Sequence, residues 1–177
     1  MASQARASDR IDAAWFRQMM GGFATGVAVV TARDADQELH GMTVNSLTSV
    51  SLDPVLLLVC FTRDSRTAEA VEESGVFAVN LLSHGQMALS NAFSRPGEDR
   101  FRDVDYELDD DGVPLLGGGL GYARCSVDAV HDGGDHIIVV AAVRSCQVRQ
   151  GEPLIFYRGR YVRAIDFEDY PVVSWWG

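Results

Sequence analysis

The sequence predicts a mainly β fold with small peripheral helices, built from about six to seven antiparallel strands. Short runs rich in β-branched residues recur along the chain, and hairpin-sized turns separate those of the last third, with no long helix between them. Parallel strands would need crossovers of about a dozen residues or more, so antiparallel pairing is favoured. A Greek-key barrel or sandwich is the expected architecture.

Composition narrows the function classes. The chain has 177 residues, which fits one domain, and its 25 acidic and 15 basic residues give a net charge of −10. That charge repels polyanions, so neither nucleic acid nor an anionic membrane is an expected partner, although a local basic pocket could bind a small anion. No stretch approaches the roughly 20 apolar residues of a membrane helix, and the N-terminus has no signal-peptide core. A cytoplasmic protein is expected.

The three cysteines, Cys60, Cys125 and Cys146, are odd in number, widely spaced, and lie in or beside apolar segments. This pattern favours buried thiols in a reducing compartment over a disulfide or a metal site.

The first half of the chain contains a helix and three strand-like runs. Asp12 is expected to cap a helix with an apolar stripe, which ends at Gly21-Gly22. A β-branched strand over 26–32 and a polar hairpin loop lead into "HGMTVNSLTSVSLDP" (40–54), which reads as one strand without clean alternation. The continuous apolar run over 54–61 predicts a strand buried on both faces. The apolar stripe of the predicted helix that follows Asp12 consists of Trp15, Phe16, Met19 and Met20.

The middle of the chain alternates helices with a strand. Asp64 or Ser65 caps a predicted helix that stops at Gly75, and a strand follows over 76–82. Ser83 and Gln86 have capping-box spacing, so another short helix is expected. The charged segment 94–114 reads as a surface excursion, and a loop of that length is more often functional than idle.

The sequence gives little support for a hydrolase or for a metal site. No serine lies in a G-x-S-x-G pattern, and no histidine is tied to a serine or cysteine, which argues against a hydrolase. "HDGGDH" (131–136) has the residue types of a metal site, but Asp-Gly-Gly-Asp also reverses a chain easily, so a hairpin turn without metal is the favoured interpretation.

The 40–54 stretch has a more specific interpretation. Its short polar side chains could meet the polar edge of a heteroaromatic ring such as a flavin. They are Thr43, Asn45, Ser46, Thr48, Ser49 and Ser51. "TRDSRT" (62–67), at a predicted helix N-terminus, offers hydroxyls and arginines for a phosphate. The alternative, a solvated edge strand followed by an ordinary capped helix, stays open on composition alone.

The order of these motifs closely resembles the short-chain flavin reductases with the FMN-binding split-barrel fold, the reductase components of two-component flavin-dependent monooxygenases. The resemblance covers about residues 14–165 of one domain spanning 1–177, and leaves 166–177 as a C-terminal tail. It rests on "FATGVAVVTA", "HGMTVNSLTSVSLDPVLLLVCFTRDSRT", "FAVNLLS", "DRF", "GDHIIVVAAV" and "PLIFYRGRYVRA".

The resemblance implies a homodimer of split β-barrels that binds FMN or FAD. NADH or NADPH would reduce the flavin, which then leaves for a separate monooxygenase. By position, residues matching the family's ring-binding segment are Thr43, Val44, Asn45, Ser46 and Leu47, with Ser49, Val50, Ser51 and Pro54 turning the chain around the ring. Residues expected along the ribityl phosphate are Cys60, Thr62, Ser65, Arg66 and Thr67.

The resemblance places two further motifs. The Arg100-Phe101 pair matches a basic-aromatic pair on the loop near the flavin, and the triplet Gly134, Asp135 and His136 matches the GDH motif associated with the nicotinamide. Hydride transfer from nicotinamide C4 to flavin N5 mainly requires stacked rings and stabilised negative charge. His136 is the candidate catalytic residue that orients the nicotinamide, and Asp135 would fix its tautomer.

Two rival functions stay open: a split-barrel enzyme that retains FMN and acts on an organic substrate itself, and a non-catalytic flavin- or heme-type binding module. Two features depart from the family pattern, namely the single proline at Pro54 where many relatives carry two, and the Trp175-Trp176 tail, which would either pack on the barrel or dimer or cover the flavin.

Overall fold

The computed structural model describes residues 11–95, 97 and 100–164, so the Trp175-Trp176 tail lies outside the described residues. Seven strands form one antiparallel sheet in the order β3-β2-β6-β9-β10-β5-β4. Their bounds are β2 (Ala28–Arg33), β3 (Leu39–Val44), β4 (Leu47–Leu52), β5 (Val55–Thr62), β6 (Val76–Leu81), β9 (Gly121–Gly133) and β10 (His136–Val148).

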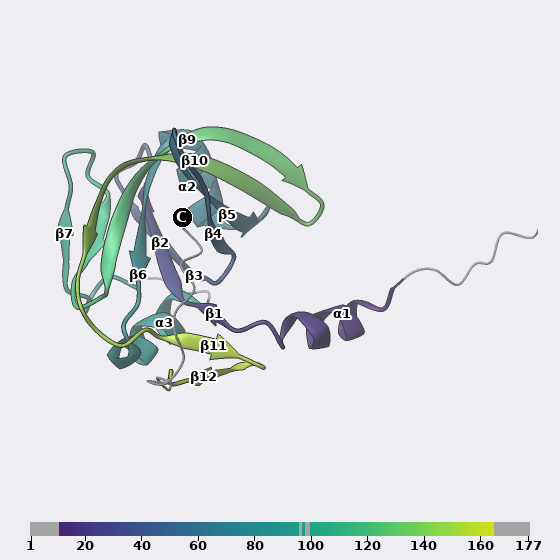
Figure 1. The fold of residues 1–177 in the computed structure, drawn as a ribbon. Coiled ribbons are helices and arrows are strands. Elements are labelled where there is room, and N and C mark those ends of the chain that lie inside the picture. The colour runs from purple at the N-terminus through teal and green to yellow at the C-terminus, as the bar shows by residue number, and fades with distance from the viewer. Residues whose placement is uncertain (1–10, 96, 98–99, 165–177) are drawn as a thin grey trace, which may run out of the picture.

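The predicted mainly β, antiparallel fold class is confirmed, but hydrogen bonds do not close the sheet into a barrel. Its two edges are β3 and β4, which are consecutive in sequence and yet not paired with each other among the described strands. The expected single strand over 40–54 is therefore wrong. It is two strands, separated at Asn45-Ser46. Figure 1 shows the sheet curving around helix α2.

Two smaller sheets complete the β structure of the described residues. Strands β1 (Thr25–Gly26), β11 (Ile155–Tyr157) and β12 (Arg160–Val162) form one, and the hairpin β7 (Tyr106–Leu108) with β8 (Pro114–Leu116) forms the other. The hairpin lies inside the predicted surface excursion over 94–114.

Helix α1 (Ala13–Met20) begins and ends where the sequence predicts. Asp12 Oδ1 accepts a hydrogen bond from Ala14 N at 2.8 Å, and Gly21 follows the last turn. However, no residue of α1 is buried, so its apolar stripe is exposed. In Figure 1 this purple helix projects away from the sheet.

The other helices pack on the sheet. Ser65, rather than Asp64, caps α2 (Arg66–Ser74), which ends at Gly75 with a φ of 69°. Helix α3 (Met87–Phe93) follows the 3₁₀ turn η1 (His84–Gln86), where Gln86 Oε1 accepts from Ser83 N at 3.0 Å as the capping box predicts. No helix among the described residues has the length and apolar character needed to cross a bilayer.

Strand β2 separates two apolar cores. Ala28, Val30 and Ala32 belong to the cluster that also contains α2 residues, whereas Val27 and Val29 belong to the cluster that contains Phe93 of α3. Alternation of side chains along a strand explains how one strand serves both clusters.

Two burial predictions are wrong in part. Strand β5 is not buried on both faces, because Leu57, Val59 and Phe61 are buried while the intervening residues are half-buried. Among the cysteines, only Cys125 is buried, and burial raises the pKa of its thiol to about 12. Cys146, on β10, is exposed.

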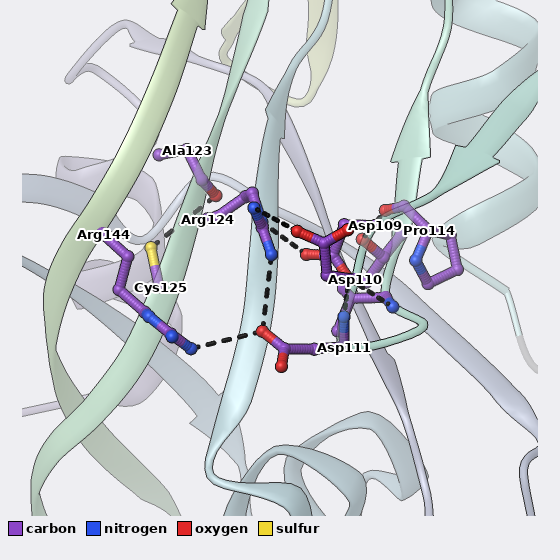
Figure 2. Close-up of polar contacts among 10 residues, drawn as sticks. Asp109, Asp110, Asp111, Pro114, Ala123, Arg124, Cys125 and Arg144 are labelled. Carbon is purple, nitrogen blue, oxygen red and sulfur yellow. Dashed lines mark hydrogen bonds and ion pairs between the residues drawn. The ribbon is translucent and has the colours of Figure 1, made fainter.

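Ion pairs fix the β7–β8 hairpin to the main sheet (Figure 2). Arg124 of β9 donates to Asp109 Oδ2 at 2.6 Å, and the Asp109 side chain is only 5% exposed. Asp109 Oδ1 accepts from Val113 N at 2.9 Å, which shapes the hairpin turn. Arg144 of β10 pairs with Asp111 at 3.2 Å. These contacts hold the turn against two neighbouring strands.

A buried amide connects the same hairpin to the core. Asn80 of β6 is 2% exposed; it donates to Val29 O at 3.1 Å and to Thr31 Oγ1 at 3.0 Å, and it accepts from Leu116 N at 2.8 Å. Each polar atom of this side chain therefore has a partner, as burial requires.

Replacing Asn80 should destabilise the fold more than replacing an exposed amide. In Asn80→Ala, the buried Leu116 N–H loses its acceptor, so the free energy of unfolding should fall by about 2–3 kcal/mol. Urea denaturation measures this, and Gln147→Ala, an exposed amide on β10, is the control. Equal midpoints for the two variants would contradict the role given to Asn80.

Candidate functional site

A cavity of about 910 Å³ lies against β3, one edge of the main sheet. We call it the main cavity. Three parts of the chain line it. They are residues 38–42 of β3 and the turn before it, residues 62 and 64–67 around the start of α2, and residues 93–95, 97, 100 and 101 at and after the end of α3. The cavity thus occupies a place where the sheet is left unpaired.

Aromatic rings support one wall of the main cavity. Phe101 packs edge-on between Phe93, at 5.0 Å between ring centroids, and Tyr106 of β7, at 5.5 Å. A Cβ atom at Gly41 would lie 2.5 Å from the Phe93 ring, so this position has room only for glycine unless the ring moves. Arg100 Nη1 donates to Gly41 O at 2.6 Å and thereby joins this wall to β3.

The start of α2 forms an anion-binding corner. Ser65 Oγ accepts from Ala68 N at 2.9 Å and sets the N-terminus of the helix. Arg66 is exposed, Thr67 is 4% exposed, and both line the main cavity with Ser65. Backbone N–H groups at a helix N-terminus together with an arginine favour a phosphate.

A smaller cavity of about 300 Å³ adjoins the first, and the two share Ser94. We call it the side cavity. Thr43, Val44 and Asn45 line it from β3 and the residue after it. Thr43 Oγ1 donates to Ser90 O at 2.7 Å, and Tyr161 OH lies 2.8 Å from Ser90 Oγ. The Thr43 hydroxyl therefore faces α3, whereas the Asn45 amide donates to Thr25 Oγ1 of β1 at 3.3 Å.

Ser46 joins β4 to β5 instead of lining a cavity. Its hydroxyl donates to Cys60 O at 2.8 Å and accepts from Cys60 N at 3.3 Å. Leu47 packs against the α2 core. The remaining predicted ring residues lie on β4 and the turn that follows it and line neither cavity; they are Ser49, Val50, Ser51 and Pro54. The structure thus divides the predicted flavin residues among several places.

The GDH triplet forms the tip of the β9–β10 hairpin, as the turn interpretation predicts. Gly134 has a φ of 82°, and Asp135 Oδ1 lies 2.7 Å from His136 Nδ1. The hydrogen bond from His136 lowers the pKa of the Asp135 carboxyl. Among the residues the structure describes, no three His, Cys, Asp or Glu side chains gather as metal ligands.

Arg63 anchors this hairpin tip beside the main cavity. Its Nε donates to Gly134 O at 2.7 Å, its backbone N–H donates to Asp135 O at 3.3 Å, and its guanidinium pairs with Asp132. The hydrogen bond from Gly134 N and the charge of Arg63 lower the pKa of the Asp132 carboxyl. In the β5–β10 ladder, His136 is the partner of Thr62, which lines the main cavity.

Sequence reasoning missed several cavity residues. His40 lines the main cavity, and its Nε2 lies 2.6 Å from Asp34 Oδ2. Glu38 and Arg95 line the same cavity, and Arg160 and Tyr161 line the side cavity. The sequence signal for His40 was its position inside the 40–54 stretch. Its contact with Asp34 could not be predicted, because that contact forms only when the β2–β3 hairpin brings the two residues together.

Fold and site together define an antiparallel β domain with a cofactor-sized cavity at an unpaired sheet edge. The family described as "Flavin reductase like domain" matches residues 20–164, and the chain belongs to this family. The resemblance found in the sequence is thereby confirmed.

Related proteins carry reductase names. The chain is 41% identical over 152 residues to "Flavin reductase" of Pseudomonas putida, covering 85% of this chain and 89% of the relative. It is 45% identical to "Probable flavin reductase" of Rhizobium meliloti over 82% of this chain, but spans only 47% of that relative's length.

Two solved structures are also similar. The NADH:FAD oxidoreductase of Streptomyces globisporus, in complex with NAD and FAD fragments, has a TM-score of 0.84 at 34% identity, covering 95% of this chain and 100% of that one. The styrene monooxygenase flavin reductase of Pseudomonas putida S12 has a TM-score of 0.79 at 34% identity, covering 89% and 99%.

Proposed function

We propose that this protein is an NAD(P)H:flavin oxidoreductase that supplies reduced flavin to a separate monooxygenase. One observation carries the proposal: the main cavity is lined both by the anion-binding corner of α2 and by Thr62, the ladder partner of His136 in the GDH hairpin. A phosphate-bearing flavin and a nicotinamide would therefore meet at this sheet edge. The names of the relatives support the reaction, and the styrene monooxygenase reductase supports the partner.

The residues present fit a flavin. When bound, the flavin supplies N5 as acceptor of the hydride from the nicotinamide. Ser65, Arg66 and Thr67 would hold its phosphate. FMN and FAD both satisfy these contacts.

The GDH hairpin would orient the nicotinamide. The Asp135 carboxylate accepts from His136 Nδ1, so the proton at that nitrogen is held in place. Nε2 is then left to contact the carboxamide or a phosphate of the dinucleotide. NADH and NADPH both present these groups.

The proposed reaction predicts turnover that depends on free flavin. Added FMN or FAD should accelerate NADH or NADPH consumption with saturation, because a supplied flavin is a substrate that leaves after each cycle. Absorbance at the nicotinamide band measures the rate. Flavin copurifying at one per subunit, with a rate indifferent to added flavin, would instead indicate an enzyme that retains FMN. No oxidation with any flavin would indicate a binding module.

His136→Ala should raise the KM for the nicotinamide while the flavin Kd stays nearly unchanged, since His136 is placed on the nicotinamide side. A loss of one hydrogen bond to a charged group corresponds to about tenfold or more. Steady-state kinetics and flavin titration separate the two effects. His131→Ala, an exposed histidine on the same hairpin, is the control. A raised flavin Kd with an unchanged KM for the nicotinamide would indicate that His136 contacts the flavin instead.

The proposed assembly is a homodimer. Trp15 and Met19 of α1 are 67% and 63% exposed, and Leu52 at the end of β4 is 67% exposed. Exposed apolar side chains gathered on one element mark interaction surfaces. The three cysteines are free thiols, which fits the proposed cytoplasmic location.

Light scattering should give a dimer at micromolar concentration. The double variant Trp15→Arg with Met19→Arg should shift the mass to that of a monomer, because it charges both exposed apolar positions. Val148→Arg, at a valine on β10 that is 82% exposed, should leave the dimer intact. A wild-type monomer would contradict the proposed assembly.

A further inference from the structure

The wall of the main cavity contains a histidine-carboxylate pair that the reaction described above does not use. His40 of β3 and Asp34, in the turn before it, approach to 2.6 Å between Nε2 and Oδ2, and their side chains are 16% and 20% exposed. Asp34 Oδ1 accepts from Glu38 N at 2.8 Å, so the hairpin backbone fixes the carboxylate. The hydrogen bond from His40 is the main reason that the pKa of the Asp34 carboxyl is lowered.

The pair leaves one ring nitrogen for a ligand. A carboxylate only accepts, so His40 Nε2 carries the proton in that contact. The imidazole lines the main cavity, and Nδ1 has no hydrogen-bond partner among the described residues. Nδ1 therefore donates to a ligand only when the ring carries both protons. In that state His40 presents a positive charge and a donor to the cavity.

The cavity contains more cationic groups than one phosphate requires. Arg66 belongs to the anion-binding corner of α2, whereas His40 comes from β3, and Arg95 and Arg100 come from the segment after α3. Among the lining residues that the structure describes, Glu38 and Asp64 are the acidic ones. The volume of about 910 Å³ lies near the upper end of small-molecule sites, which leaves room for a second nucleotide unit beside FMN.

We infer that His40, held by Asp34, is a specificity residue for the second phosphate of FAD, so that this chain binds FAD in preference to FMN. FMN ends at its single phosphate, which the α2 corner holds. FAD continues through a second phosphate to adenosine, and that phosphate is the anion His40 would bind. This inference rests on the proposed function, because it takes the ligand of the main cavity to be a flavin.

Titrations with riboflavin, FMN and FAD test the assignment. His40→Gln should weaken FAD about tenfold or more and leave FMN and riboflavin within about twofold, because only FAD has the second phosphate. Asp34→Asn should act in the same direction, since it removes the carboxylate that holds the imidazole in place. Arg66→Ala is the contrasting variant. It should weaken FMN and FAD alike and spare riboflavin.

The control removes the opposite charge from the same wall. Glu38→Gln should not weaken FAD, because it takes a negative charge away from the cavity. Equal losses of FMN and FAD affinity in His40→Gln would place His40 at the part that the two flavins share. An unchanged FAD affinity in His40→Gln would show that the second phosphate does not bind at His40. Either result overturns the inference.

The assay separates this inference from the proposed function. Binding is followed by flavin fluorescence without nicotinamide, and reduction is followed independently with either flavin. If the protein reduces free flavin but His40→Gln shows no selective loss, only the FAD assignment fails. If no flavin is reduced, the proposed function fails and the affinity ratio still reports on His40.

Discussion

The break between β3 and β4 determines where this protein can bind a ligand. At Asn45-Ser46 the chain leaves one edge of the sheet and crosses to the other, where the Ser46 hydroxyl bonds both backbone groups of Cys60. Strand β4 then pairs with β5 and leaves the outer side of β3 without a strand partner. An unpaired edge exposes N–H and C=O groups that need cover. Arg100 covers one of them, Gly41 O, and the main cavity lies against residues 39–42 of this edge.

The opposite wall of the main cavity depends on contacts far from any ligand. Arg100 and Phe101 follow α3 in a segment with little regular structure, and Phe101 is held between Phe93 and Tyr106. Tyr106 belongs to the β7–β8 hairpin, which Asn80 and Arg124 fasten to the sheet. A buried amide and a nearly buried ion pair thus position a cavity wall through one aromatic contact. The ion pair contributes position more than stability, because desolvation offsets much of its attraction.

Sequence patterns predicted the parts of the fold that are decided locally. The caps at Asp12 and Ser65, the stop at Gly75 and the Ser83–Gln86 box depend on neighbours within about four residues, so their signals are complete in the sequence. The Asn45-Ser46 break was missed because a strand that changes edges has the same composition as one strand that continues. The Asp34–His40 pair was missed because it forms only across the β2–β3 hairpin. The exposure of Cys146 was missed because it depends on which other elements pack against β10.

Exposure of the charges in the main cavity bears on how firmly a flavin would be held. Arg66 and Arg95 are exposed, so water and salt screen their attraction for a phosphate. Deeply buried cations would bind more tightly and would retain the product. With a net charge of −10, the rest of the protein surface repels an anionic flavin, so the cavity is the favoured place for it to bind and the surroundings favour its departure. A cavity that attracts the anionic flavin, within a surface that repels it, suits the proposed reductase, because this enzyme must exchange its flavin in every cycle.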